Sequence, residues 1–306
     1  MDDFLVRPVT ELRREGWNCR QLSKAVGSGE LVRVVRSVYG SGTAPTGREA
    51  HLARARAMLT RLGSSMVLSH ATAALVHGLS IEVDDPGDVH LTVAPPARGR
   101  RRSGYHVHVA PIPAEDVTEI YGLRVTSLER TAADLARVVP FAWGVVAMDE
   151  VLRREVDREM LRDLAEAAAH RAGVDTLRGV VEFADGRAQS PAESLSRVSM
   201  MRAGIPQPEL QFQITNESGW VADSDFAWPD LGVVGEVDGE GKYDEQVKRG
   251  RSAGKVVRYQ QDRDEQIRQA GWWPTHWGWA LVTDVQQLGA QIRGAFAASG
   301  AWRGAR

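Results

Sequence analysis

The sequence predicts an α/β protein with an N-terminal winged helix-turn-helix, a middle region of helices with a β-hairpin, and a C-terminal mixed sheet with flanking helices. Three observations predict this architecture. A helix signal followed by an alternating basic segment opens the chain, helical and alternating segments follow it, and short strand patterns alternate with helices from residue 190 onward. The expected domains are residues 1–45, 46–186 and 187–306.

The composition describes an ordinary globular chain of 306 residues, 43% of them hydrophobic and 25% charged. A formal net charge of −2 excludes a uniformly basic coat, so a contact with a polyanion has to come from local basic patches. Cys19 is the single cysteine, which excludes an internal disulfide and a cysteine-based zinc cage. No apolar run approaches the ~20 residues of a membrane span, and the start MDDFLVRPVT lacks signal-peptide features. We therefore expect a cytoplasmic protein without a membrane partner.

The segment GWNCRQLSKAVGSGELVRVVRSVYG, residues 16–40, predicts the second half of the winged helix-turn-helix. Asn18 is the expected helix cap, Gln21 stands at the capping-box position, and a Gly-Ser-Gly break at residues 27–29 precedes an alternating basic strand. Such a unit offers a helix to the major groove and a wing to the phosphates. A small structural helix-hairpin with solvated arginines explains the same pattern. The expected DNA contacts are Arg20, Lys24, Arg33 and Arg36.

The middle region contains VHLTVAPPARGRRRSGYHVHVAPIP, residues 89–113, which predicts a β-hairpin around an arginine-rich loop. Arg100 and Arg101 are the loop residues that we expect to contact phosphate, and a solvated loop is the alternative. The following segment TSLERTAADLARVV predicts an amphipathic helix with a capping box of Thr126 and Glu129.

Histidines recur in the middle region without acidic partners at metal-ligand spacing. His70 and His77 lie seven apart on a predicted helix, which favours buried or cap-bonded side chains over a metal pair. His90, His106 and His108 alternate along the predicted strands. Because no carboxylate stands in register with them, we interpret them as residues of a strand face.

Acidic residues in the last segment lie around a predicted buried strand. In WVADSDFAW and VVGEVDG, strand alternation puts Asp225 on one face of its strand and Glu236 on one face of the next. Facing side chains on paired strands lie about 5 Å apart, and two carboxylates at that distance repel each other unless a cation lies between them. A divalent metal site is therefore the favoured interpretation, and a plain hairpin is the alternative.

The aspartate, the short turn and the Glu-x-Asp at the end of an apolar strand, preceded by a helix with a glutamate, resemble the PD-(D/E)XK nuclease superfamily. The resemblance covers roughly residues 188 to 285 and is closest to domains similar to very-short-patch repair endonucleases. It implies a restriction-endonuclease-like mixed sheet. The matching positions are Glu193, Asp225, Glu236, Asp238 and Lys242.

This resemblance implies hydrolysis of DNA phosphodiesters assisted by Mg²⁺ or Mn²⁺. Asp225, Glu236 and Asp238 would ligate the metal, which activates a bound water. Glu193 would orient a water or ligate a second ion, and Lys242 would orient the nucleophile or neutralise the transition state. The basic segment after the acidic residues would hold the DNA backbone. Its expected contacts are Lys248, Arg249, Arg251 and Lys255.

The chain departs from the superfamily pattern at one position. The superfamily lysine belongs two residues after the glutamate, where this chain has Asp238, so Lys242 or Lys255 would have to substitute for it. The S-P-x-E pattern ending at Glu193 also explains that glutamate as a capping box. A domain with a metal site and no competent catalytic group would bind nucleic acid without cutting it.

The front of the chain, residues 10–40 together with the TSLERTAADLA helix, is similar to the AbiEi-like antitoxin regulators of type IV toxin-antitoxin systems. That resemblance implies binding of promoter DNA through a winged helix. The leading expectation is thus a DNA-binding protein with a metal-dependent nuclease-like domain. The alternative is a non-enzymatic transcriptional regulator or antitoxin with a degenerate nuclease-like domain and a cognate toxin or other protein partner. Action on RNA in place of DNA stays open.

Overall fold

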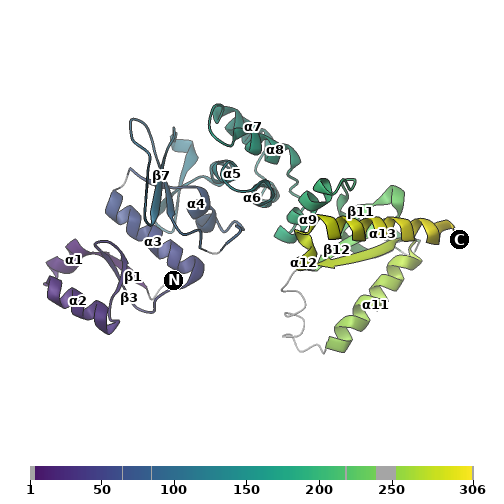
Figure 1. The fold of residues 1–306 in the computed structure, drawn as a ribbon, viewed down its shortest axis with the longest axis horizontal. Coiled ribbons are helices and arrows are strands. Elements are labelled where there is room, and N and C mark those ends of the chain that lie inside the picture. The colour runs from purple at the N-terminus through teal and green to yellow at the C-terminus, as the bar shows by residue number, and fades with distance from the viewer. Residues whose placement is uncertain (1–3, 64, 84, 218, 239–252, 305–306) are drawn as a thin grey trace. The chain divides into compact units, whose positions relative to one another are not determined.

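The computed structural model describes residues 4–63, 65–83, 85–217, 219–238 and 253–304 of a mixed α/β chain with helices and mixed sheets (Figure 1). The chain divides into two compact units. The first comprises Met1–Pro140 with Val156–Val181, and the second comprises Phe141–Glu155 with Glu182–Arg306. The division into three domains drawn from the sequence stays a prediction.

The first unit opens with two short helices and a small antiparallel sheet of order β1-β3-β2. Its elements are β1 (Leu5–Pro8), α1 (Val9–Arg14), α2 (Cys19–Ser28), β2 (Val32–Val35) and β3 (Val38–Ser41). Leu12, Leu22, Ala25 and Leu31 form its core. The predicted single strand after α2 is a hairpin of β2 and β3, because Ser37 adopts a φ of 67° at the turn between them.

A six-stranded mixed sheet of order β6-β7-β5-β4-β9-β8 forms the rest of the first unit together with its helices. Its strands are β4 (Val67–Leu68), β5 (Val89–Val93), β6 (Arg100–Arg102), β7 (Tyr105–Val109), β8 (Val117–Ile120) and β9 (Leu123–Thr126). The helices are α3 (Gly47–Leu62), α4 (His70–His77), α5 (Leu128–Ala136), α7 (Arg158–Ala167) and α8 (Val174–Phe183). Residues of α3 and α4 share one hydrophobic core with β4, β5, β7 and β9.

Two details of the middle region differ from the sequence predictions. Strands β5 and β7 are parallel neighbours, so residues 89–113 do not form one hairpin around the arginine loop. The antiparallel partner of β7 is the short strand β6, which lies in the predicted loop. The helix α5 is capped by Ser127, whose side chain accepts from the backbone N–H of Arg130, and the capping box predicted at Thr126 is wrong.

The second unit contains a four-stranded sheet of order β10-β11-β12-β13. Strands β10 (Glu209–Asn216), β11 (Gly219–Trp228) and β12 (Val233–Asp238) form an antiparallel meander, and β13 (Trp273–Gly278) pairs with β12 in parallel. A parallel neighbour requires a crossover, which the chain makes through α11 (Ala253–Gln269). The other helices are α6 (Phe141–Arg153), α9 (Pro191–Arg202), α12 (Trp279–Val282) and α13 (Val285–Gly304).

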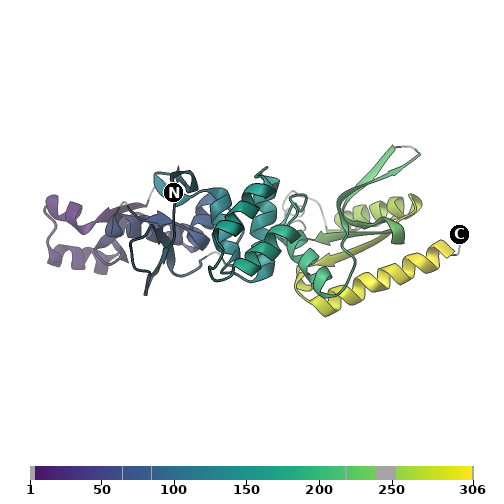
Figure 2. The same cartoon turned by 90° about the horizontal axis from the view of Figure 1, so that it is seen from above.

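Helices cover both faces of this sheet. Residues of α6, α9 and α13 share a core with Phe226, Val237 and Trp277 on one face, and Figure 2 shows α13 as the long yellow helix. On the other face, Ile267 of α11 packs against Val234 and its neighbours. Burial of a side chain as large as Trp277 contributes roughly 3–5 kcal/mol relative to alanine. Because side chains alternate along β11 and β12, the residues between those of the first core point toward α11. Across the described part of the chain, no helix combines the length and apolar character needed to cross a membrane.

Candidate functional site

Helix α2 begins and ends as its sequence predicts. The Asn18 side chain accepts from the Gln21 backbone N–H at 3.0 Å, and the Gln21 side chain accepts from the Asn18 N–H at 2.9 Å, which completes the predicted capping box. Gly29 ends the helix with a φ of 79°. Leu22 and Ala25 are buried, so the opposite face of α2 is left to solvent.

The exposed surface of α2, β2 and the following turn is basic. Arg20 and Lys24 lie one turn apart on α2, Arg33 lies on β2, and Arg36 lies at the turn before β3. All four side chains are exposed, and among the described residues none of them forms a salt bridge. Exposed, unpaired cations can contact phosphates without first breaking an ion pair.

A groove of about 340 Å³ lies between α1, α2 and the β2–β3 hairpin. Its lining residues include Arg13, Ser23, Arg33, Arg36 and Tyr39. Arg13 of α1 and the hairpin residues Arg33 and Arg36 thus line one concave surface. Arg20 and Lys24 lie outside this lining, at exposed positions of α2. We call Arg20, Lys24, Arg33 and Arg36 the basic surface.

The arginines predicted on the middle loop lie on the exposed edge strand β6. Arg101 Nε donates to Asp88 at 3.0 Å, and the Arg100 guanidinium lies 5.8 Å from the ring centroid of Tyr105. Arg101 is therefore already paired with a carboxylate. Residues 239–252 lie outside the described part of the chain, and so does the side chain of Lys255. The predictions for Lys242, Lys248, Arg249, Arg251 and Lys255 fall there.

The structure brings Asp225 and Glu236 together on the face of the sheet that α11 covers. The β11–β12 ladder ends at the pair of Phe226 and Gly235, so Asp225 and Glu236 are the next residues beyond it on the two strands. Asp225 Oδ2 accepts from the backbone N–H of Val237 at 2.9 Å. Asp225 is therefore held by the backbone of β12 next to Glu236, and its charge acts on the Glu236 carboxylate.

An arginine from α11 occupies the space beside Glu236. Arg263 Nη1 donates to Glu236 Oε2 at 2.9 Å, Nη2 lies 2.6 Å from Oε1, and Nη2 also donates to the carbonyl of Asp223 at 2.6 Å. Burial raises the pKa of Glu236 above its ordinary value, Arg263 and His276 oppose that shift, and the charges of Asp225 and Asp238 reinforce it. The positive charge at this carboxylate thus comes from a guanidinium.

A histidine on β13 adds a second basic side chain to the site. His276 pairs in register with Glu236, its Nδ1 lies 3.8 Å from Glu236 Oε2, and its Nε2 lies 2.9 Å from Asp264 Oδ1. Burial lowers the pKa of His276, but the hydrogen bond and charge of Asp264 and the charges of Glu236 and Asp238 outweigh it, so the net pKa is raised. Sequence patterns do not point to Arg263 or His276, because both residues come from elements far along the chain from Glu236.

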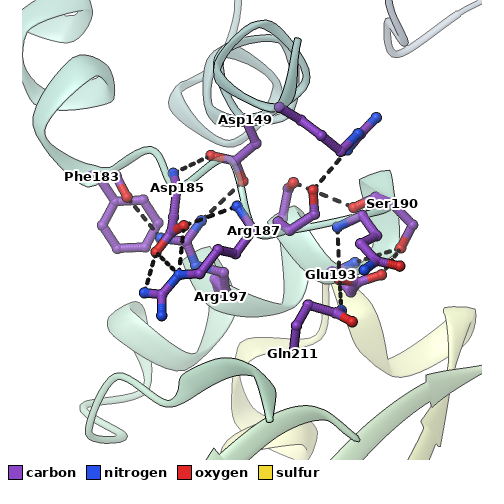
Figure 3. A network of polar contacts seen from close by, with 12 residues as sticks. Asp149, Phe183, Asp185, Arg187, Ser190, Glu193, Arg197 and Gln211 are labelled. Atoms are coloured by element: carbon purple, nitrogen blue, oxygen red, sulfur yellow. Dashed lines mark hydrogen bonds and ion pairs between the residues drawn. The ribbon is translucent and has the colours of Figure 1, made fainter. Parts of the chain in front are cut away.

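Glu193 lies at the first turn of α9, where it serves as part of a helix cap. Its Oε1 accepts from Ser190 Oγ at 2.8 Å, and its Oε2 accepts from the Gln189 N–H at 2.8 Å and from Gln211 Nε2 at 2.9 Å (Figure 3). Burial raises its pKa, and the charge of Asp225 acts in the same direction. The capping role is thus present in the structure, and the electrostatic effect places Glu193 near the acidic pair.

A buried ion pair between Arg197 and Asp149 links α9 to α6 next to the helix cap of α9. Arg197 donates to Asp149 Oδ2 at 2.9 Å and to the carbonyl of Phe183 at 2.7 Å, while the backbone N–H of Asp185 donates to Asp149 Oδ1 at 2.6 Å (Figure 3). Burial raises the pKa of Asp149 to about 6, against the charge of Arg197 and these hydrogen bonds. The network positions the N-terminal end of α9, and with it Glu193.

Glu193, Asp225, Glu236 and Asp238, which we call the acidic cluster, carry oxygen ligands of the kind that Mg²⁺ prefers. Within the described part of the chain, however, they are not among the side chains whose ligand atoms converge closely enough to hold an ion. Glu236 Oε1 is buried without a hydrogen bond, and its charge is balanced by Arg263. While that guanidinium is in place, Glu236 does not fit the role of a Mg²⁺ ligand, because a divalent ion and Arg263 would compete for the same carboxylate.

Comparison with known proteins relates the chain to antitoxin domains and to uncharacterized bacterial proteins. Residues 65–182 match the family model of the AbiEi antitoxin C-terminal domain. The solved structure of the RV2827C protein from Mycobacterium tuberculosis is similar to 69% of this chain and 79% of its own, with a TM-score of 0.41 and 17% identity.

Two relatives are more similar in sequence. The uncharacterized proteins MT2308 and Rv2248, from two strains of Mycobacterium tuberculosis, are each 31% identical to this chain over 221 residues, which covers 72% of this chain and 78% of theirs. The chain therefore belongs to the same protein family as these two mycobacterial proteins.

Proposed function

We propose that the protein is a DNA-binding regulator of the antitoxin type and that its N-terminal region, residues 4–41, contacts the DNA. One observation carries the proposal: the basic surface is exposed and unpaired within the described residues, and it lies N-terminal to the segment that matches an antitoxin domain. Two short helices followed by a hairpin, as in α1, α2, β2 and β3, are the elements of a winged helix-turn-helix.

The energetics of phosphate contact support this role. Each phosphate neutralised by Arg or Lys releases counterions and contributes about −0.9 to the slope of log affinity against log salt. Near 0.1 M salt, each such contact is therefore worth roughly tenfold in affinity. The basic surface supplies four candidate contacts without breaking an existing ion pair.

Fluorescence anisotropy with a duplex from upstream of the protein's own coding sequence tests the proposal. We expect the wild-type chain to bind this duplex more tightly than a scrambled one, and Arg33→Ala/Arg36→Ala to weaken binding by roughly one hundredfold. The matched control Arg162→Ala/Arg178→Ala removes the same charge from α7 and α8, where both arginines pair with glutamates. RNA of the same sequence serves as competitor.

Equal losses in both double variants would contradict the proposal, since they would report net charge alone. Preference for the RNA competitor would move the proposal from DNA to RNA. The proposal also implies a toxin as the functional counterpart of this chain, which co-expression with neighbouring coding sequences would reveal by relief of growth arrest.

A second candidate function is metal-dependent DNA cleavage by the second unit. It is favoured by the closeness of Asp225 to Glu236 beyond the end of the β11–β12 ladder and by the order α9, β10, β11, β12, α11, β13, which resembles that of the PD-(D/E)XK fold. The ion pair between Glu236 and Arg263 weighs against it.

Nicking of supercoiled plasmid in Mg²⁺ or Mn²⁺ distinguishes the two candidates. Cleavage that disappears in Asp225→Asn and in Glu236→Gln would establish the enzyme. Cleavage that survives both changes would come from a contaminant. DNA binding without any cleavage in either metal would leave the regulator as the function of the chain.

A further inference from the structure

Three histidines in the first unit come together from three separate elements. His70 is the first residue of α4, His90 lies on β5, and His108 lies on β7. Because β5 and β7 are parallel neighbours, with His90 opposite His106 and Thr92 opposite His108, the strand histidines project from one face of the sheet. We call His70, His90 and His108 the histidine cluster.

Ring nitrogens of the histidine cluster converge on one point. One nitrogen from each residue lies within 4.8 Å of the other two, and His90 Nδ1 lies 3.0 Å from His108 Nε2. Zinc bound by imidazole has Zn–N distances of about 2.0–2.1 Å, and a tetrahedral arrangement then separates the nitrogens by roughly 3.3 Å. The nitrogens of His90 and His108 are therefore already close to that separation, and His70 joins them once one of the stacked His70 and His108 rings reorients.

One of the two ring nitrogens of His70 has no hydrogen-bond partner. His70 is 1% exposed, and its Nε2 is buried without a hydrogen-bond partner. Its Nδ1 lies 2.9 Å from Ser69 Oγ, which also accepts from Thr92 Oγ1 at 2.7 Å. With Nδ1–H donating to Ser69, Nε2 presents a lone pair, and this is the outer-shell contact that metal-bound histidines make.

The electrostatic environment favours neutral imidazoles. Burial lowers the pKa of His90 to about 4 and that of His108 to about 3, and the neighbouring histidines add to both shifts. Burial also lowers the pKa of His70 well below its ordinary value, although the charge of Asp134 opposes the shift. Neutral imidazole is the form that binds metals, so no proton has to be displaced near neutral pH.

We propose that the histidine cluster binds one divalent transition-metal ion of the zinc class, with water or another exchangeable ligand completing the coordination. Imidazole ligands suit Zn²⁺, Cu²⁺, Fe²⁺ and Ni²⁺, whereas Mg²⁺ prefers oxygen. The ion would join α4 to β5 and β7 within the segment that matches the antitoxin domain, residues 65–182. Its role is structural stabilisation of this sheet, independent of the DNA contact proposed above.

The alternative arrangement has no ion and keeps the rings neutral, with a hydrogen bond between His90 Nδ1 and His108 Nε2. The His70 and His108 rings are stacked, with centroids 3.8 Å apart and planes 18° apart. A metal ion lies in the planes of the imidazoles that bind it, so coordination requires one of these rings to rotate away from the stack. Metal binding and ring stacking therefore predict different responses to added metal.

The test uses the full chain, freed of metal with a chelator and dialysed against Zn²⁺, with bound metal measured by mass spectrometry. We expect one ion per chain for the wild type and loss of that ion in His70→Ala and in His108→Ala. His106→Ala is the matched control, because His106 lies on the same strand, with its ring centroid 3.9 Å from that of His108, and is not one of the three ligands. Asp225→Asn/Glu236→Gln should also retain the zinc.

Two further measurements separate coordination from a folding defect. His108→Cys should restore zinc binding that His108→Ala loses, because cysteine thiolate is itself a zinc ligand. Co²⁺ in place of Zn²⁺ should give the intense visible absorption of a tetrahedral site in the wild type and in His108→Cys. A zinc concentration about 100 times Kd should raise the melting temperature of the wild type by about 5 °C.

Absence of stoichiometric zinc in the folded wild-type chain would overturn the proposal. Zinc binding that is unchanged in folded His70→Ala and His108→Ala would overturn it as well, since the ion would then lie elsewhere.

Discussion

Replacing Arg263 by methionine tests whether the acidic cluster of the second unit depends on its arginine. The side chains of Glu236 and Arg263 are 13% and 27% exposed. Breaking a fully buried ion pair costs about 3–5 kcal/mol, and the partial exposure of Arg263 places this pair near the lower end. We therefore expect Arg263→Met to lower the free energy of unfolding by about 3 kcal/mol, which is about 10 °C in the melting temperature of a unit of this size.

A double-mutant cycle isolates the pair from the other contact of Arg263. Arg263 also donates to the carbonyl of Asp223, so its removal costs more than the ion pair alone. Glu236→Gln removes the charge that Arg263 neutralises. The double variant should therefore be more stable than the sum of the two single losses predicts, with a coupling energy of about 1–2 kcal/mol.

Urea denaturation followed by tryptophan fluorescence measures these changes in the second unit. Of the nine tryptophans, only Trp17 belongs to the first unit, so the signal reports almost entirely on the second. Additive losses, with a coupling energy near zero, would refute the conclusion that Arg263 is the cation that makes the acidic pair tolerable. Added Mg²⁺ should stabilise Arg263→Met more than the wild type, because the variant no longer supplies a competing guanidinium.

Three further predictions concern the surroundings of the acidic cluster. Ser190→Ala should lower the free energy of unfolding by about 1 kcal/mol, because a helix cap is lost. Glu193→Ala should lower it by about 3 kcal/mol, because buried hydrogen-bond donors lose their acceptor. Equal losses of the two variants in urea titrations would contradict the buried role of Glu193. The pKa of Asp149 is raised from 3.8 to about 6 in the folded protein. The protonated Asp149 therefore stabilises the folded state below pH 3.8, and about 3 kcal/mol of stability is lost as the pH rises through the folded-state pKa. Asp149→Asn should remove that part of the pH dependence, and an unchanged pH profile of stability would refute the assignment. A Cβ on Gly235 would lie 2.7 Å from the Trp277 ring, so Gly235→Ala should destabilise the second unit by about 1–3 kcal/mol, and an unchanged denaturation midpoint would show that the ring moves aside.

Local patterns predicted the elements that depend on neighbouring residues. The capping box of Asn18 and Gln21 needs only residues three apart, and the structure contains both of its hydrogen bonds. Strand alternation likewise predicted that Asp225 and Glu236 share a face, because side-chain direction along a strand has a fixed period. The β11–β12 pairing reaches their chain neighbours Phe226 and Gly235, and Asp225 accepts from the backbone N–H of Val237, the residue after Glu236.

The same patterns do not predict which distant segments of the chain pair or contact each other. Alternation does not encode strand direction, so the parallel pairing of β5 with β7 was mistaken for a hairpin. The histidine cluster is not predicted for the same reason. His90 and His108 are close only because β5 and β7 are parallel neighbours, and His70 comes from a separate helix. Arg263 was missed because α11 returns it to Glu236 from 27 residues along the chain.

The salt dependence of DNA binding tests the central claim, that the unpaired basic surface of residues 4–41 contacts the phosphate backbone. If all four cations contact phosphates, the slope of log affinity against log salt should be about −3.6 for the wild type and about −1.8 for Arg33→Ala/Arg36→Ala. The control Arg162→Ala/Arg178→Ala should keep the wild-type slope. A slope that stays the same in the Arg33/Arg36 variant would contradict the account, because those two arginines would then make no contact with DNA.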